Sequence, residues 1–315
     1  MGATYRNPVH DGYFADPFVL SVDGTFYAYG TEPPIDGSMV VPMLRSDDLV
    51  HWTMTGHALE RPELPAARDY WAPEVAREAG RYFLYYSVGV DDRGHRLRVA
   101  SADAPDGPFR GAHALTPEDD PFTIDAHPFR DVDGQWYLYY ARDFLDGERV
   151  GTALVVDRML DMETLGGRPR TVLRASADWQ LFQRRRSMYG AVHDWHTLEA
   201  PFVVHRDGRY YCFYSGGSWL EESYGVSYAV AETPLGPFVD PPGEGPRLLR
   251  SVPGHVLGPG HCSVVTGPDG CDYLVYHAWD PDRSARRMCI DRLEWGTDGP
   301  RTAGPTWTPQ PAPAG

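Results

Sequence analysis

Five ionisable side chains, each shortly before a similar turn, have the types needed for acid–base chemistry. They are Asp16, Glu74, Asp125, Glu199 and His261. Carboxylates brought close together cannot all stay ionised, so at least one pKa rises while another stays low. Glycoside hydrolysis requires such a pair. One neutral acid protonates the leaving oxygen, and one carboxylate activates water or attacks carbon.

Each acid taken alone also has a simpler interpretation. An acidic residue at the start of a strand often does no more than accept backbone hydrogen bonds in a turn. However, an ionisable residue stands at a similar position before the turn in all five repeats, and this recurrence favours a shared site. If these strands are the innermost ones of radially arranged sheets, the five side chains start level around one axis and converge on a single pocket.

The segments that carry these residues predict β-hairpins. In the clearest one, the apolar residues 197–206 precede the turn Asp207-Gly208, and the aromatic run 210–214 follows it. An Asp-Gly turn between two strands is the strongest short-range hairpin signal. Equivalent turns, each followed by aromatic strand, are Asp23-Gly24, Ala79-Gly80, Asp133-Gly134 and Asp269-Gly270. The spacing allows one four-stranded sheet per repeat, so we predict an all-β, five-bladed β-propeller with four-stranded blades, forming one domain over residues 1–315.

Aromatic and histidine side chains are expected around the mouth of this pocket. Trp71, Trp195 and Trp219 would suit the apolar faces of sugar rings. The longest connection, residues 157–196, is expected to form a wall, because long loops in compact domains are usually functional or mobile. His193 and His196 are three residues apart, but a loop is favoured over a metal site because no helical carboxylate accompanies them.

The composition excludes several classes of partner. The formal net charge is -15, whereas binding to nucleic acid or an anionic membrane needs a concentrated positive surface. We therefore expect neither as a partner, and we interpret Arg184-Arg185-Arg186 as a solvated loop. The four cysteines show no zinc spacing and are expected to be free thiols. No secretory leader is evident, so we expect a cytoplasmic enzyme, or a secreted one if a leader has been removed.

Several motifs in this order resemble glycoside hydrolase family 43, whose members are five-bladed propellers acting on arabinans, arabinoxylans and related plant polysaccharides. The resemblance extends over nearly the whole chain. The motifs that carry it are Asn7-Pro8, Asp16-Pro17, Ser46-Asp47-Asp48-Leu49-Val50-His51-Trp52, Trp71-Ala72-Pro73-Glu74, Ile124-Asp125, Leu198-Glu199-Ala200-Pro201, Gly260-His261 and Tyr276-His277. Ala126 and Ala200 depart from the commoner proline and glycine of the family, which keeps both carboxylates and leaves the shape of the subsites open.

The resemblance implies inversion at the anomeric carbon. Asp16 would be the general base, Glu199 the general acid, and Asp125 the residue that tunes and orients the acid. An inverting pair needs room for a water molecule, with about 6.5–9.5 Å between the carboxyl groups. Trp71, Glu74, His261, Arg286 and Trp195 would bind substrate, with Arg287 as a rival for the role of Arg286.

The same resemblance bears on cofactor and substrate. It allows a structural calcium ion in the central channel near His261, while the chemistry itself would need no cofactor. The expected substrate is a plant cell-wall oligosaccharide, cleaved by an α-L-arabinofuranosidase or exo-arabinanase that releases L-arabinose. A β-D-xylosidase of the same family is the alternative. A propeller that binds glycans without cleaving them is a third interpretation, which the presence of all three acids disfavours.

Overall fold

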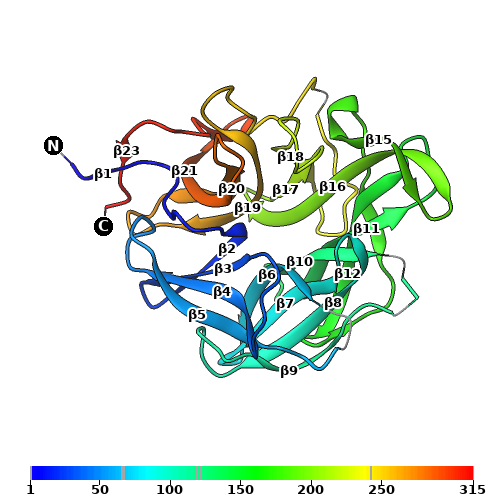
Figure 1. Ribbon diagram of the computed structural model, residues 1–315, viewed down its shortest axis with the longest axis horizontal. Coiled ribbons are helices and arrows are strands. Elements are labelled where there is room, and N and C mark those ends of the chain that lie inside the picture. Colours follow the sequence, from blue (N-terminus) through cyan, green and yellow to red (C-terminus); the bar gives the residue numbers. More distant parts are fainter. Residues whose placement is uncertain (1, 65–67, 118, 121, 242, 315) are drawn as a thin grey trace.

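The computed structural model describes residues 2–64, 68–117, 119–120, 122–241 and 243–314. Within them the chain is built of strands, apart from the short 3-10 helix η1 (Asp178–Gln180). Figure 1 shows the sheets arranged radially around a central axis, with the first blade beside the last. The predicted five-bladed β-propeller is therefore confirmed.

Consecutive antiparallel strands make up each blade, with the innermost strand first in sequence. Blade one contains β2 (Ala15–Val22), β3 (Thr25–Thr31), β4 (Met39–Ser46) and β5 (Thr53–Glu60). Blade two contains β6 (Asp69–Glu78), β7 (Arg81–Val90), β8 (Arg93–Ala102) and β9 (Arg110–Ala114). Blade three contains β10 (Thr123–Arg130), β11 (Trp136–Phe144), β12 (Gly151–Asp161), β13 (Thr164–Leu165) and β14 (Arg170–Leu173). Blade four contains β16 (Ala191–Arg206), β17 (Arg209–Gly216) and β18 (Gly225–Ala231). Blade five contains β19 (Leu257–Thr266), β20 (Asp272–Trp279), β21 (Arg286–Gly296) and β22 (Gly299–Thr302).

The hairpin turns lie where the sequence predicts them, between the first and second strand of each blade. At Asp23-Gly24, Ala79-Gly80 and Asp207-Gly208 both turn residues have positive φ. This is the backbone of a type I′ turn, whose twist matches that of the flanking strands. The aromatic strands that follow the turns are β3, β7, β11, β17 and β20.

The apolar core consists of one cluster at each interface between neighbouring blades. Tyr29 of blade one and Tyr86 of blade two belong to one cluster, for example, and Val19 of blade one and Val275 of blade five belong to another. The other three clusters join blades two and three, three and four, and four and five. Burial of apolar surface therefore closes the ring as well as each sheet.

Blades three and four share one continuous sheet, because β12 runs parallel to β16 for two residue pairs, Gly151 with His196 and Thr152 with Thr197. Gly151 has a φ of 147°, and a Cβ atom there would lie 1.8 Å from the carbonyl oxygen of His196. Only glycine permits this close approach. The first residues of β16 extend beyond the shared sheet and pair with β15 (Leu181–Met188) as a hairpin.

The two ends of the chain meet beside blade five. The short strands β1 (Thr4–Tyr5) and β23 (Gln310–Pro311) pair with each other. The four cysteines are free thiols, as the sequence predicts. No helix in the described part of the chain has the length and apolar character needed to cross a membrane.

Candidate active site

An irregularity of the backbone recurs at the same place in every blade. Each innermost strand contains a register shift against its neighbour, which marks a β-bulge. Within each shift stands one residue other than glycine in the left-handed region, with φ between 49° and 60°: Asp16, Ala72, Asp125, Ala200 and His261. Such backbone is uncommon and concentrates at functional sites. Bulges also re-aim side chains.

The sequence predicts that the five ionisable residues stand at equivalent positions of their strands. The positions of the bulges show that this prediction is wrong. Asp16, Asp125 and His261 are themselves the left-handed residues, but Glu199 lies one position before Ala200, and Glu74 lies two positions after Ala72. A period-two strand pattern cannot reveal such a shift, because a bulge inserts an extra residue. The five side chains therefore do not start level around the axis.

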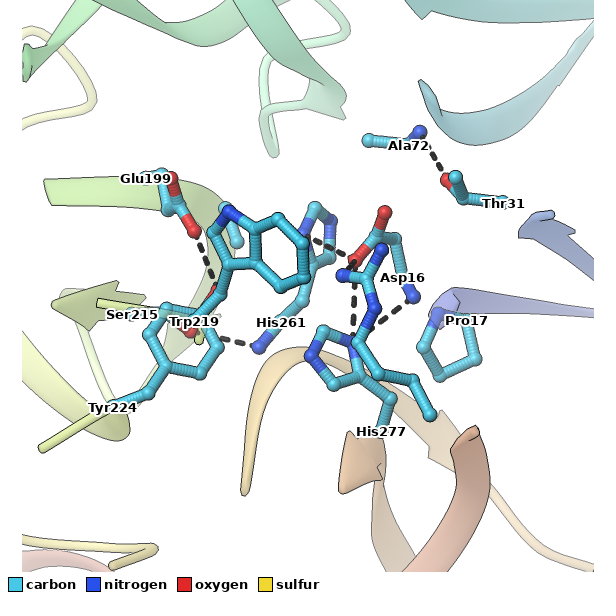
Figure 2. Close-up of polar contacts among 12 residues, drawn as sticks. Asp16, Pro17, Thr31, Ala72, Glu199, Ser215, Trp219, Tyr224, His261 and His277 are labelled. Carbon is cyan, nitrogen blue, oxygen red and sulfur yellow. Dashed lines mark hydrogen bonds and ion pairs between the residues drawn. The ribbon is translucent and has the colours of Figure 1, made fainter. Parts of the chain in front are cut away.

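Side chains of the preceding blade satisfy the amide groups of four bulges. The Ala72 N–H donates to Thr31 Oγ1 at 2.8 Å, and the His261 N–H donates to Ser215 Oγ at 2.8 Å (Figure 2). The Ala200 N–H donates to Asp125 Oδ2 at 2.9 Å. At the junction of blades five and one, the Asp16 N–H donates to His277 Nδ1 at 3.0 Å. Each of these four bulges is thus fixed by a hydrogen bond between blades.

Asp16 lies in a buried, positively charged environment. Its Oδ1 atom is 3.2 Å from Arg286 Nη1 and 3.4 Å from His261 Nδ1. Burial alone would raise the pKa of Asp16, but Arg286 and the two histidines outweigh it, so the pKa falls well below its ordinary value. Burial lowers the pKa values of His261 and His277, that of His277 to about 4. At neutral pH the positive charge therefore comes from Arg286, and Asp16 is ionised.

Glu199 has the opposite tendency. Burial raises its pKa to about 7, and the charge of Asp16 adds to this effect, although Tyr224, Arg286 and Arg186 oppose it. The Tyr224 hydroxyl donates to Glu199 Oε1 at 2.6 Å (Figure 2). Glu199 therefore holds a proton through mildly acidic conditions and about half the time near neutral pH.

Asp125 links the two other acids. Its Oδ2 atom accepts the amide of Ala200, the residue directly after Glu199, and lies 4.0 Å from His261 Nδ1. Burial raises the pKa of Asp125, and the nearby charges of Glu199 and Asp16 raise it further. A carboxyl group in this position fixes the backbone beside Glu199 and couples its own ionisation to that of the pair.

The three acids open onto one pocket of about 250 Å³. The structure brings most of the predicted site residues to its wall. They are Asp16, Asp125, Glu199, Trp71, His261 and Arg286, together with the predicted rim residue Trp219. Arg286 rather than Arg287 reaches the pocket, because Arg287 pairs with Asp280 at 3.0 Å.

Glu74 and Trp195 do not line this pocket. Glu74 Oε2 lies 2.7 Å from His127 Nδ1 in the interior. The Val203 N–H donates to the other ring nitrogen of His127, so Nδ1 carries the proton that Glu74 accepts. Trp195 is only 1% exposed and packs against Tyr189 and Arg186. Both residues were predicted to bind substrate, and the structure gives them packing and hydrogen-bonding partners instead.

The calcium ion that the resemblance allows near His261 has no ready set of side-chain ligands among the described residues. Calcium takes six to eight oxygen ligands, and among the described residues no group of three or more His, Cys, Asp or Glu side chains is arranged to hold a metal ion. The Nδ1 atom of His261 faces Asp16 and Asp125.

Sequence reasoning missed several residues that shape the site. Tyr224 contacts Glu199, and its ring stacks on His277 with a centroid distance of 5.9 Å. Tyr13 accepts a hydrogen bond from Arg286 Nε at 3.0 Å, and Thr31 lines the pocket. Tyr224 and Tyr13 lie in irregular segments, where period-two patterns give no signal. His277 was noted only as part of a motif, and its contact with Asp16 depends on closure of the ring.

Comparisons with known proteins agree with this geometry. A family model described as "Glycosyl hydrolases family 43" matches residues 5–300. A β-D-galactofuranosidase of Aspergillus niger is 30% identical, covering 93% of this chain and 83% of its own length. An extracellular exo-α-(1→5)-L-arabinofuranosidase of Streptomyces chartreusis is 26% identical, covering 88% and 83%. The crystal structure of a thermostable family-43 glycoside hydrolase is 32% identical, with a TM-score of 0.86 over 99% of this chain and 100% of that one.

Proposed function

The chain belongs to glycosyl hydrolases family 43, and on that premise we propose that it is an inverting, exo-acting α-L-arabinofuranosidase. Its substrates would be oligosaccharides derived from plant arabinan or arabinoxylan. The observation that carries the proposal is that Asp16, Asp125 and Glu199 share one pocket, in which Arg286 lies 3.2 Å from Asp16 and keeps it ionised, while burial raises the pKa of Glu199 to about 7.

In this mechanism Asp16 accepts a proton from water as the water oxygen bonds to the anomeric carbon. Glu199 gives its proton to the glycosidic oxygen as the bond between that oxygen and the anomeric carbon breaks. Asp125 is a positioning residue, since it binds the backbone amide next to Glu199. Because carboxyl groups perform both proton transfers, we propose that activity persists in the presence of a chelator such as EDTA.

The size of the pocket supports exo action on a single terminal sugar. It measures about 250 Å³, Asp16 and Asp125 are each less than a tenth exposed, and Glu199 is partly buried. Arg286 pairs with Asp16, and its guanidinium lies 4.5 Å from the ring centre of Trp219. A guanidinium so placed can bind hydroxyls of the terminal ring, and Trp71 can cover an apolar face.

A β-D-galactofuranosidase is the second candidate, because the relative that is 30% identical carries that name. The α-L-arabinofuranosyl and β-D-galactofuranosyl rings have the same relative configuration and differ in the substituent on C4. One pocket could therefore accept either ring. A β-D-xylosidase remains the third candidate, because relatives at 25% identity include a β-xylosidase of Xylanibacter ruminicola.

Hydrolysis of three p-nitrophenyl glycosides tests the order of these candidates. We expect kcat/KM to be highest for the α-L-arabinofuranoside, lower for the β-D-galactofuranoside and lowest for the β-D-xylopyranoside. A clear preference for the galactofuranoside would replace the first candidate with the second. A preference for the xylopyranoside would refute a furanosidase.

The stereochemistry and the role of Asp16 have their own test. NMR of fresh product should show the inverted anomer first, and initial retention would refute water activation by Asp16. Replacement Asp16→Asn keeps the shape of the side chain but removes the base. It should lower kcat by about 10²–10⁴-fold.

A further inference from the structure

A second pocket lies next to the first. It measures about 320 Å³, within the size range of ligand sites, and is formed by two turns that belong to different blades. The β7–β8 hairpin contributes Asp92, Arg93 and Gly94, and the β15–β16 hairpin contributes residues 186–190. Phe122 completes the wall. Figure 1 shows β15 beside the extended start of β16, near β11 and β12 of blade three.

Aromatic stacking connects the two pockets. The ring of Trp71, which lines the pocket of the three acids, stacks on His95 at 3.7 Å between centroids. His95 in turn meets Phe122 edge-on at 5.6 Å. Phe122 directly precedes β10, the strand that carries Asp125. The second pocket therefore adjoins the first along the side formed by blades two and three.

The second pocket is also linked to the proposed acid through β16, whose first residues form the hairpin with β15. Its β15–β16 turn is continuous with the strand that carries Glu199. Among the charges that oppose the effect of burial on the pKa of Glu199 is Arg186, a residue of the second pocket. In hydrolysis, the proton of the acid goes to the leaving oxygen, so the leaving group departs on the acid's side.

The wall of this pocket has the chemistry that recognises sugar hydroxyls. Arg186 is mostly buried, and its Nη2 atom lies 2.6 Å from Asp92 Oδ2. A guanidinium supplies several donors and a carboxylate only acceptors, so the pair can bind neighbouring hydroxyl groups. The Tyr189 hydroxyl donates to Asp143 Oδ2 at 2.7 Å, which anchors the hairpin on blade three. Phe122 and Tyr189 add aromatic surface for the apolar face of a ring.

We propose that this pocket binds the first sugar residue of the leaving group, with Arg186 and Asp92 contacting its hydroxyls. The proposal rests on the proposed function and adds a determinant of substrate length. It implies that the enzyme distinguishes an oligosaccharide from an aryl glycoside by contacts made through the β15–β16 hairpin. The ligand class is a neutral pentose or hexose unit.

The test compares two substrates that share the cleaved sugar. One is α-1,5-linked L-arabinobiose, and the other is p-nitrophenyl α-L-arabinofuranoside, which has no leaving-group sugar. If the wild type prefers another sugar, the disaccharide and aryl glycoside of that sugar take their place. The ratio of kcat/KM for the disaccharide to kcat/KM for the aryl glycoside should fall about tenfold in Asp92→Ala and in Arg186→Gln. Most of the change should appear as a higher KM for the disaccharide.

Arg184→Ala is the matched control. Arg184 belongs to the same β15 strand but pairs with Asp194 at 3.4 Å and does not line this pocket. Its ratio should equal that of the wild type. Asp92 lies in a turn and is more than half exposed, so Asp92→Ala should fold even if Arg186→Gln does not. A ratio within twofold of the wild type in Asp92→Ala, and in Arg186→Gln where that variant folds, overturns the subsite. Failure of the proposed function would appear differently, as a wild type that hydrolyses no aryl glycoside.

Discussion

At the residue scale, two carboxyl groups in one small pocket have different protonation states because different neighbours surround them. Asp16 faces Arg286, whose charge is permanent, and Glu199 faces a phenol hydroxyl in a buried environment. The charge of Asp16 itself helps to keep the proton on Glu199. The ionised base and the protonated acid therefore favour each other, and the pair is ready for reaction before substrate binds.

The pH dependence of kcat/KM should reflect this pair. Activity needs Glu199 protonated and Asp16 ionised, so it should fall as pH rises through about 7, the pKa of Glu199. No acid limb from Asp16 should appear in the usual range, because its pKa is well below the ordinary value. In Arg286→Met the pKa of Asp16 should rise and bring an acid limb into view. Initial rates in overlapping buffers measure both limbs, and an unchanged acid side in Arg286→Met would contradict the account of Asp16.

Tyr224 should act as a positioning residue for the acid. Its hydroxyl occupies Glu199 Oε1, which leaves Oε2 to carry the proton, and it stabilises the ionised form. Tyr224→Phe should therefore move the alkaline limb to higher pH. It should also lower kcat on oligosaccharides by about 10–100-fold, because the acid loses its orientation. A dinitrophenyl glycoside, whose leaving group needs no proton, should be affected much less.

Tyr228→Phe is the control for this prediction. Tyr228 lies in β18, four residues after Tyr224, and its hydroxyl donates to the backbone carbonyl of Asp298 rather than to the site. The control should keep the pH profile of the wild type. Equal losses on both classes of substrate in Tyr224→Phe, with an unmoved pH profile, would indicate a purely structural role.

At the element scale, the bulges explain which parts of the site the sequence could predict. Asp16, Asp125 and Glu199 were found because three acids stand at similar points of three repeats. The common position predicted for the five ionisable residues fails at Glu199 and Glu74, because an alignment of the repeats on ionisable residues hides the bulges. Pro17, Pro73 and Pro201 each follow a left-handed residue, and alignment on these prolines would have matched Ala72 and Ala200 with Asp16. It would also have placed Glu74 deeper than the pocket.

The hydrogen bonds between blades should contribute measurably to stability. Ser215 is fully buried, and its hydroxyl accepts the amide of the bulge at His261. Ser215→Ala leaves that buried N–H without a partner and should lower the free energy of unfolding by about 1–3 kcal/mol. Urea titration followed by tryptophan fluorescence measures the change.

Ser87 provides a matched control in blade two. It pairs with Trp71 as Ser215 pairs with Glu199, and it is equally buried. Its hydroxyl has no hydrogen-bond partner among the described residues. Ser87→Ala should therefore change stability much less than Ser215→Ala, and equal losses in both would show that the bulge bond adds nothing beyond packing.

At the scale of the whole molecule, the sequence predicts the ring but not how it closes. The Asp-Gly turns and the aromatic strands repeat locally, so five sheets can be counted from the sequence. The shared sheet of blades three and four depends on one close approach of the backbone at Gly151. No local sequence pattern predicts this approach. The contact of His277 with Asp16 joins residues of the last and first blades. Contacts of this kind arise from the complete fold.

The N-terminal segment should hold the ring closed. The side chain of Asn7 makes two hydrogen bonds to the backbone of Ile290 in β21. Its Nδ2 atom donates to the Ile290 carbonyl oxygen at 2.8 Å, and its Oδ1 atom accepts a hydrogen bond from the Ile290 N–H at 2.9 Å. Farther along, the amides of Val9 and Phe14 donate to the carbonyl oxygens of Met288 and Arg286. This segment therefore covers the part of β21 that β22 does not reach, next to the residue that binds Asp16.

Asn7→Ala removes both bonds to Ile290, and those that Asn7 Nδ2 donates to Thr306, and leaves the amide of Ile290 without its partner. The free energy of unfolding should fall by about 1–3 kcal/mol, and kcat should fall with it because Arg286 is anchored on the same strand. Gln310→Ala is the control, since in the part of the chain that the structure describes the side-chain amide of Gln310 donates only to the nearby Thr308. Urea unfolding and initial rates on the same preparations give both quantities. If stability falls but activity stays complete, closure of the ring by the N-terminal segment does not affect the geometry of the acids. If neither stability nor activity falls, the N-terminal segment does not hold the ring closed.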